Sequence, residues 1–376
     1  MEKTLYIHIG GPKTGTTTLQ DFFSRNRQVL RDRGFFYPGS GLNHLGICRE
    51  LMNQTVSGIK SLPGLSVMKW IDEVEKSDCP VCLISAECLA FMGGAEKLRE
   101  LLSSSPQVKI IYYARRQDTL IESRYNQFVK ASIYRMKENL DENLVDSFYR
   151  RVDFDHLQVI TPWADEFGKE NVIVRCYEES QMPSGIIEDF ARIIGLSLDH
   201  TLEIPKKRMN ASLDIHHTEF IRLCNRVFND RPEINDYLDR EQFRESLVFK
   251  HLPMQHRLAP KIRIEILNHY EPSNQQFARE YLGREDGRLF YAPWPDPSEP
   301  WEPYQGLTPE EIVPIFTEMI YTSEMRQKRE IQKKELQPLT SCLEILNYFL
   351  KKVMLLIPGG IKQYIQVKND HWNNRK

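Results

Sequence analysis

The sequence has no long hydrophobic run and no excess of charge of either sign. No stretch of about 20 uncharged apolar residues occurs, so no obvious membrane span is expected. Net charge is −2, from 50 Lys and Arg against 52 Asp and Glu, and this balance does not indicate a nucleic-acid partner. A basic N-terminal segment followed by a long apolar one is also missing. We therefore expect no signal peptide and a cytoplasmic location.

Cysteine is scarce and odd in number. Seven cysteines are scattered over 376 residues, which favours reduced thiols over a disulfide framework. Cys79 and Cys82 form a lone CxxC pair without a second pair or a neighbouring histidine. Such an isolated pair does not predict a zinc or redox site.

A glycine-rich loop near the N-terminus lacks the lysine of ATPases and GTPases at its usual place. The apolar run Leu5–Ile9 predicts a buried parallel strand, and apolar residues at helical spacing follow the loop. Gly10 and Gly15 keep the glycine spacing of a phosphate-binding loop, but Thr16 follows where lysine is usual. The lysine is inside the loop instead, as Lys13. A strand, a glycine-rich loop and a helix in this order predict a phosphate site.

This arrangement resembles the 5′-phosphosulfate loop of the sulfotransferases, which use 3′-phosphoadenosine 5′-phosphosulfate (PAPS) as donor and release PAP. The resemblance implies that the loop binds the donor, with Lys13 against the bridging oxygen. A fixed cation there stabilises the charge that develops as the sulfonate leaves. The implied donor-binding residues of the loop are Pro12, Lys13, Thr14, Gly15, Thr16 and Thr17.

A second motif supports the same family. Val108–Ala114 reads as a strand, Arg115 follows it, and Ser123 stands eight residues later on a predicted helix. In the sulfotransferases an arginine and a serine at this spacing hold the 3′-phosphate of the donor. Arginine suits this role because its planar fork binds two phosphate oxygens at once. The run 115–127 looks like the bacterial branch that modifies carbohydrates.

A third segment has two interpretations. Arg208 and Asn210 belong to a stretch similar to the family's Arg-x-Asn-x-Ser-Leu segment, which implies a basic loop over the donor. Alternatively, this is an ordinary basic loop followed by Ser212 as the N-cap of the next helix.

The acceptor hydroxyl has to lose a proton, and two residues are candidates for the base. Glu87 ends the predicted strand Pro80–Glu87, and ligands of open α/β sheets gather at that edge. His44, on a preceding loop, is the alternative. His8 lies within the first strand, where we expect it to shape the site. No metal is expected, since Lys13 and the helix N-terminus supply positive charge.

The order of elements predicts an α/β fold with a P-loop-type parallel sheet flanked by helices. Residues 1–290 form the expected sulfotransferase domain, 291–309 a Pro/Trp-rich linker, and 310–376 a mostly helical extension. One helix is expected over 15–33, a loop over 35–41 and a strand over 171–177. The sequence also predicts a helix that starts at Thr308, and helices over 214–282 with breaks near the prolines. Those prolines are Pro232, Pro253 and Pro272.

The C-terminal extension contains an amphipathic segment over residues 339–357. Three interpretations stay open: packing on the catalytic domain, a peripheral contact with the inner membrane face, or a homodimer contact.

The predicted reaction is sulfonate transfer from PAPS to a hydroxyl of a saccharide or glycolipid. Two alternatives remain, a P-loop kinase and a non-catalytic nucleotide-binding adaptor. The displaced lysine argues against the kinase, and the joint presence of Lys13, Glu87, Arg115 and Ser123 argues against the adaptor.

Overall fold

The computed structural model describes residues 3–39, 41–44, 46, 51, 67–102, 107–131, 134–205, 215–227, 256–313 and 315. Arg208, Asn210 and the segment 339–357 lie outside these residues. The chain divides into two compact units, which are described separately. The first unit takes residues 1–124, 140–211 and 258–302, and the second takes 125–139, 212–257 and 303–376.

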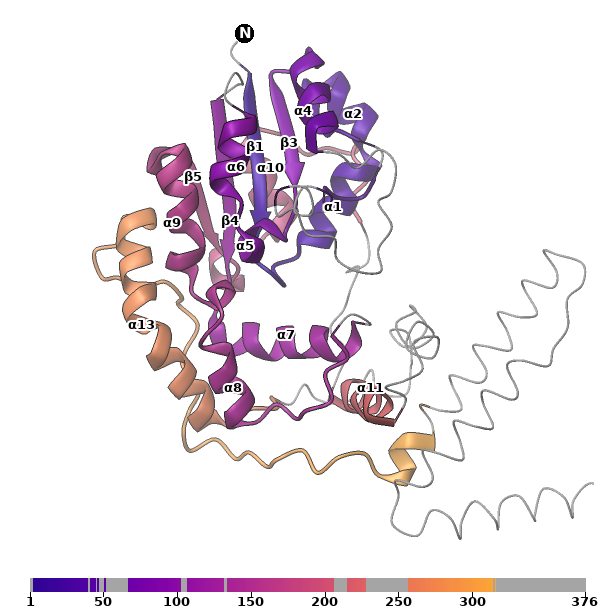
Figure 1. Cartoon of the computed structure of the whole chain (residues 1–376), viewed down its shortest axis with the longest axis vertical. Coiled ribbons are helices and arrows are strands. Elements are labelled where there is room, and N and C mark those ends of the chain that lie inside the picture. Colours follow the sequence, from indigo (N-terminus) through magenta and orange to yellow (C-terminus); the bar gives the residue numbers. More distant parts are fainter. Residues whose placement is uncertain are drawn as a thin grey trace, which may run out of the picture. The chain divides into compact units, whose positions relative to one another are not determined.

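The first unit is built on a five-stranded sheet in the order β2-β3-β1-β4-β5, and every paired neighbour is parallel. Figure 1 shows β1, β3, β4 and β5 side by side. The strands are β1 (Thr4–Gly10), β2 (Phe35–Phe36), β3 (Val81–Ser85), β4 (Gln107–Ala114) and β5 (Val172–Cys176). The prediction of a parallel α/β fold is confirmed, and the four long strands lie where apolar runs indicated them.

Helices cover both faces of the sheet because the apolar residues of a strand point alternately to its two sides. One core cluster contains Leu5, Ile7 and Ile9 of β1 and the other contains Leu83 of β3 and Ile111 of β4. The first face is covered by α4 (Val67–Lys76), α5 (Leu89–Met92), α6 (Ala95–Leu101), α9 (His156–Phe167) and α13 (Pro260–Leu282). The second face is covered by α1 (Thr16–Arg25), α2 (Arg27–Asp32) and α10 (Ile186–Ile194).

The other described elements are shorter or belong wholly or partly to the second unit. They are α7 (Gln117–Lys130), α8 (Glu142–Phe148), α11 (Ile215–Val227) and the 3₁₀ turns Val152–Phe154, Lys169–Asn171 and Glu179–Gln181. In the second unit a helix starts after Thr308 with a reciprocal cap: Thr308 N–H donates to Glu311 and Glu311 N–H donates to Thr308 Oγ1. This capping box confirms the helix start that the sequence predicts.

The single helix expected over 15–33 is wrong, since α1 and α2 are separated at Asn26. The Asn26 side chain donates to the Phe22 carbonyl at 2.8 Å and to the Glu203 carbonyl at 2.9 Å. Its Oδ1 accepts from the Glu203 N–H at 2.7 Å. An asparagine that bonds to backbone groups in this way competes with the helical ladder.

Three further expectations need correction. Pro272 lies inside α13 without ending it, because Tyr270 and Phe277 on either side of it are buried and hold the helix in place. The short edge strand β2 was expected to be loop. Cys88 is disulfide-bonded, so the expectation of reduced thiols is wrong there, although the other described cysteines are free. Within the described part of the chain, no helix has the length and apolar composition needed to cross a membrane.

Candidate active site

The glycine-rich loop joins β1 to α1 at the carboxyl edge of the sheet, between the ends of β3 and β4. A Cβ on Gly10 would lie 2.7 Å from the Glu87 Cα, and one on Gly11 would lie 1.8 Å from the Tyr113 carbonyl oxygen. Both glycines also have positive φ, at 98° and 106°. The main chain therefore passes where no side chain fits, which brings the loop against both neighbouring strands.

Lys13 sits in the loop with a φ of 64°, which residues other than glycine rarely adopt. Two hydrogen bonds hold this conformation: Thr14 Oγ1 donates to the Gly11 carbonyl at 2.5 Å, and Arg115 Nη1 donates to the Lys13 carbonyl at 2.7 Å. Gly15, the N-cap of α1, has no side chain to occupy the first helical N–H groups. Such a helix start binds an anion readily.

Arg115 directly follows β4 and reaches back to the loop. Its Nε donates to Thr119 Oγ1 at 3.3 Å, and its guanidinium lies 5.9 Å from the ring centre of Tyr177. Burial lowers the pKa of Arg115, but an arginine keeps its charge in proteins. The structure thus places the cation that follows β4 beside the backbone of Lys13, so two motifs 102 residues apart in the sequence meet at one site.

Ser123 lies on α7 and is buried, with only 5% of its surface exposed. Within the described residues its Oγ has no hydrogen-bond partner. Buried hydroxyls are seldom left unpaired in folded proteins. A ligand oxygen would supply the partner, as the 3′-phosphate role predicts.

Glu87 follows β3 by two residues and is half-buried. Its Oε2 accepts a short hydrogen bond from Thr16 Oγ1, the first residue of α1. The carboxylate predicted as base therefore lies at the loop that is predicted to bind the donor.

His44, the alternative base, is buried and fully engaged. Ser85 N–H donates to its Nδ1 at 3.1 Å, so the neutral ring carries its proton on Nε2, which donates to the Pro38 carbonyl at 3.1 Å. Tyr37 and Trp70 pack edge-on against the imidazole. Burial lowers the pKa of His44 to about 4. The structure gives this ring a place beside the end of β3 with both nitrogens occupied by backbone groups.

His8 lies beneath the loop in a buried polar network. Its Nδ1 is 2.9 Å from Ser85 Oγ, and Gln20 Nε2 donates to the same hydroxyl at 3.1 Å. Burial lowers the pKa of His8 to about 3, so the ring is neutral. The network ties β1, α1 and β3 together just below the loop.

Two residues at the site carry no local motif and were not predicted. His156, the first residue of α9, donates from Nε2 to the Arg115 carbonyl at 2.9 Å, and Tyr112 OH donates to its Nδ1 at 2.8 Å. Tyr177 follows β5, and its N–H donates to the Ala114 carbonyl at 2.6 Å. Its position just after a strand, like that of Arg115, is a signal that sequence reasoning could have used.

Comparison with known proteins gives a family match and several distant likenesses. The family model described as "Sulfotransferase domain" matches residues 5–277. An uncharacterized protein of Archaeoglobus fulgidus is 30% identical over 180 residues, which cover 46% of this chain and 46% of that protein. The chain thus aligns with less than half the length of this curated relative.

Three of the solved structures that resemble this chain are sulfotransferases or sulfotransferase domains. A sulfotransferase from Alicyclobacillus acidocaldarius has a TM-score of 0.36 at 15% identity and covers 60% of this chain and 93% of its own. The sulfotransferase domain of the curacin biosynthetic pathway has a TM-score of 0.35 at 13% identity, covering 71% of this chain and 97% of its own. A mouse sulfotransferase complexed with PAP has a TM-score of 0.34 at 12% identity, covering 76% of this chain and 87% of its own.

These structural scores are low, and the assignment rests on the domain match, which spans well over half of the chain. The chain belongs to the sulfotransferase domain family, whose enzymes use PAPS as the sulfonate donor.

Proposed function

We propose that this protein transfers the sulfonate of PAPS to a hydroxyl group of a saccharide or glycolipid acceptor. The observation that carries the proposal is the hydrogen bond from Arg115 Nη1 to the Lys13 carbonyl. It joins the residue proposed to hold the 3′-phosphate to the loop proposed to hold the 5′-phosphosulfate. A donor that carries both a 3′-phosphate and a 5′-phosphosulfate, as PAPS does, suits this pair of sites.

In the proposed reaction each residue has one role. Loop N–H groups, the start of α1 and the Lys13 ammonium stabilise the oxygen on which charge develops when the sulfonate leaves. Arg115 and Ser123 hold the 3′-phosphate and so orient the donor. Glu87 accepts the proton of the attacking hydroxyl, since its carboxylate lies at the loop while His44 has both nitrogens engaged. Catalysis is then mostly positioning and charge stabilisation.

The proposal is tested by nucleotide binding and by transfer. We expect PAP to displace a labelled donor analogue at far lower concentration than ATP, because the loop lacks the lysine of ATPases. We also expect Lys13→Gly to abolish transfer while leaving the fold intact, since glycine adopts the positive φ of this position without strain. Equal affinity for PAP and ATP, or normal transfer by Lys13→Gly, would overturn the proposal.

The acceptor class is inferred from the run 115–127, which looks like the bacterial branch that modifies carbohydrates. Incubation of the enzyme with ³⁵S-labelled PAPS and a cell extract, followed by glycosidase digestion of the labelled product, tests this inference. Label that glycosidases release into small fragments supports a saccharide. Label that stays on a protein or on a glycan-free small molecule contradicts it.

A further inference from the structure

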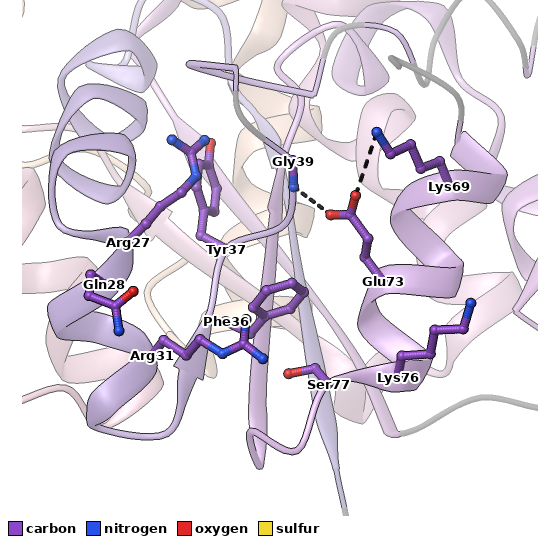
Figure 2. Close-up of a pocket in the computed structure, with 10 residues that line it drawn as sticks. All are labelled: Arg27, Gln28, Arg31, Phe36, Tyr37, Gly39, Lys69, Glu73, Lys76 and Ser77. Carbon is purple, nitrogen blue, oxygen red and sulfur yellow. Dashed lines mark hydrogen bonds and ion pairs between the residues drawn. The ribbon is translucent and has the colours of Figure 1, made fainter.

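A cavity of about 520 Å³ lies outside the donor site, along the edge of the sheet at β2. Figure 2 shows its walls, which come from α2, β2 with the following loop, and α4. Four of its lining residues are cations, and one is an acid. The cations are Arg27, Arg31, Lys69 and Lys76, and the acid is Glu73.

The cavity therefore carries an excess of three positive charges, in a protein whose net charge is −2. Glu73 is already counted in this difference, and its carboxylate also has a structural role. Its Oε2 accepts from the Gly39 N–H at 2.7 Å, and its Oε1 lies 3.9 Å from the Lys69 ammonium (Figure 2). The acid fixes the loop after β2 to α4, and the other three cations line the space around it.

Ring contacts order both arginines, and Arg27 is also held by hydrogen bonds from Nη1 to Ser24 Oγ at 2.8 Å and from Nη2 to the Gly41 carbonyl. The Arg27 guanidinium lies 5.0 Å from the ring centre of Tyr37, and the Arg31 guanidinium lies 5.4 Å from that of Phe36. An arginine stacked on a ring has lost part of its freedom already, so binding an anion orders it at a lower entropic cost. Within the described residues, Arg27 Nε is buried without a hydrogen-bond partner.

The exposed cations of the cavity form only weak ion pairs with neighbouring carboxylates, which an anionic ligand would have to replace. Arg31 Nη2 lies 3.8 Å from Asp78 Oδ1, and Lys76 Nζ lies 2.7 Å from Asp72 Oδ1. All four side chains are more than half exposed. Exposed ion pairs of this kind contribute about 0–1 kcal/mol. A ligand with several anionic groups can therefore replace them.

The cavity is connected to the proposed base by a short run of contacts. Glu73 holds Gly39, and the neighbouring Pro38 carbonyl accepts from His44. His44 in turn accepts from the Ser85 N–H, two residues before Glu87. In the strand order, β2 lies beside β3 on the side away from β1, so the cavity and the donor loop lie on opposite sides of β3.

We propose that this cavity binds an anionic group of the acceptor, a sulfate ester or a carboxylate on a saccharide. The inference rests on the proposed function, because it adds a distal subsite to the acceptor of that reaction. A neutral sugar carries no charge for the three excess cations to attract, whereas a saccharide with several acidic groups would be attracted to all of them.

The test measures binding without turnover, in the presence of PAP. Fluorescein-labelled hexasaccharides of one length, bearing sulfate, carboxylate or no charge, are titrated with the full chain and followed by anisotropy. The variant Lys69→Glu/Lys76→Glu reverses two cations that are more than half exposed, so the fold should be retained. Lys261→Glu is the matched control, because Lys261 is an exposed helical lysine 3.9 Å from a glutamate four residues later, like Lys69.

We expect one or both anionic hexasaccharides to bind, and the double variant to weaken that binding about tenfold or more, because attraction becomes repulsion. The Lys261→Glu control should stay within about twofold of the unmodified chain, and PAP affinity should not change. Equal binding of the neutral hexasaccharide, or unchanged binding by the double variant, would overturn the inference. PAP binding and sulfonate transfer are measured separately from hexasaccharide binding. An unmodified chain that binds the anionic hexasaccharides but neither binds PAP nor transfers sulfonate would contradict the proposed function and not this inference.

Discussion

Glu87 and His44 both lie near the end of β3, but their surroundings differ. Glu87→Gln keeps an oxygen that accepts from Thr16, and it removes the ability to take a proton. We expect this variant to bind PAP normally and to transfer sulfonate about 10²–10⁴ times more slowly. Single-turnover rates and PAP titrations measure the two effects. Full activity of Glu87→Gln would return His44 to consideration as the base.

Ser123 offers a cleaner test of the 3′-phosphate site than Arg115 does. Arg115 also holds the Lys13 carbonyl, so its removal disturbs the loop, whereas the Ser123 hydroxyl has no partner in the described residues. A hydrogen bond to a charged group contributes about 1.5–3 kcal/mol. We therefore expect Ser123→Ala to weaken binding of PAPS by about 10–100-fold.

Adenosine 5′-phosphosulfate, which lacks the 3′-phosphate, is the control ligand for both residues. Its affinity should be unchanged in Ser123→Ala, and Arg115→Ala should weaken PAPS more than this ligand. Calorimetric titration of both ligands gives the comparison. A parallel loss for the two ligands would mean that these residues act through the fold.

At the scale of elements, the start of α9 supports the end of β4. His156 donates to the Arg115 carbonyl and accepts from Tyr112, so it fixes the point where the chain leaves the strand. We expect His156→Phe to lower the affinity for PAPS more than that for adenosine 5′-phosphosulfate. His156→Gln, whose Nε2 also donates, should restore part of the PAPS affinity that His156→Phe loses.

Thermal unfolding of the two His156 variants separates positioning from simple stability. A lower melting temperature with an unchanged ratio of the two affinities would assign His156 a structural role only.

The four long strands were predictable because most of their residues are apolar and polar turns flank them. The break at Asn26 was not, since its cause is Glu203, which is 177 residues away in the sequence. The continuity of α13 through Pro272 likewise depends on burial on both sides of the proline. The local sequence pattern predicts an element where local interactions determine it. The prediction fails where a contact with a residue distant in the sequence determines the structure.

At the scale of the whole molecule, the site follows the same rule. Lys13, Arg115 and Ser123 belong to motifs with a fixed spacing, so each was predicted from its own neighbourhood. The contact between Arg115 and the Lys13 carbonyl requires that β1 and β4 be neighbours, and strand order is a property of the fold. Tyr177 and His156 have no motif of their own, and contacts made in the folded chain bring them to Arg115.

The amphipathic segment 339–357 lies outside the described residues, and its membrane interpretation remains a prediction. Basic residues near an anionic bilayer gain about 1 kcal/mol each. We expect the full chain to sediment with phosphatidylglycerol-containing vesicles and a 1–337 truncation to stay in the supernatant. Neutral phosphatidylcholine vesicles serve as control. Sedimentation of both proteins, or of neither, would contradict a membrane role for this segment.

The buried histidines have a consequence for acid lability. Burial lowers the pKa of His8 to about 3 and of His44 and His156 to about 4, whereas an unfolded histidine titrates near about 6.5. Below pH 6.5 the unfolded chain takes up protons that the native fold excludes, so stability falls between about pH 6.5 and 4 and is fully present above that range.

All three rings hold strand ends, His8 and His44 at Ser85 and His156 at Arg115. We expect urea midpoints to drop from pH 7 to pH 5, and PAP binding to weaken before the far-UV signal changes. Urea midpoints that do not change between pH 7 and pH 5 would contradict this prediction. Acid would then inactivate the enzyme by loosening the edge of the sheet at which the donor is proposed to bind, while the strands themselves stay paired.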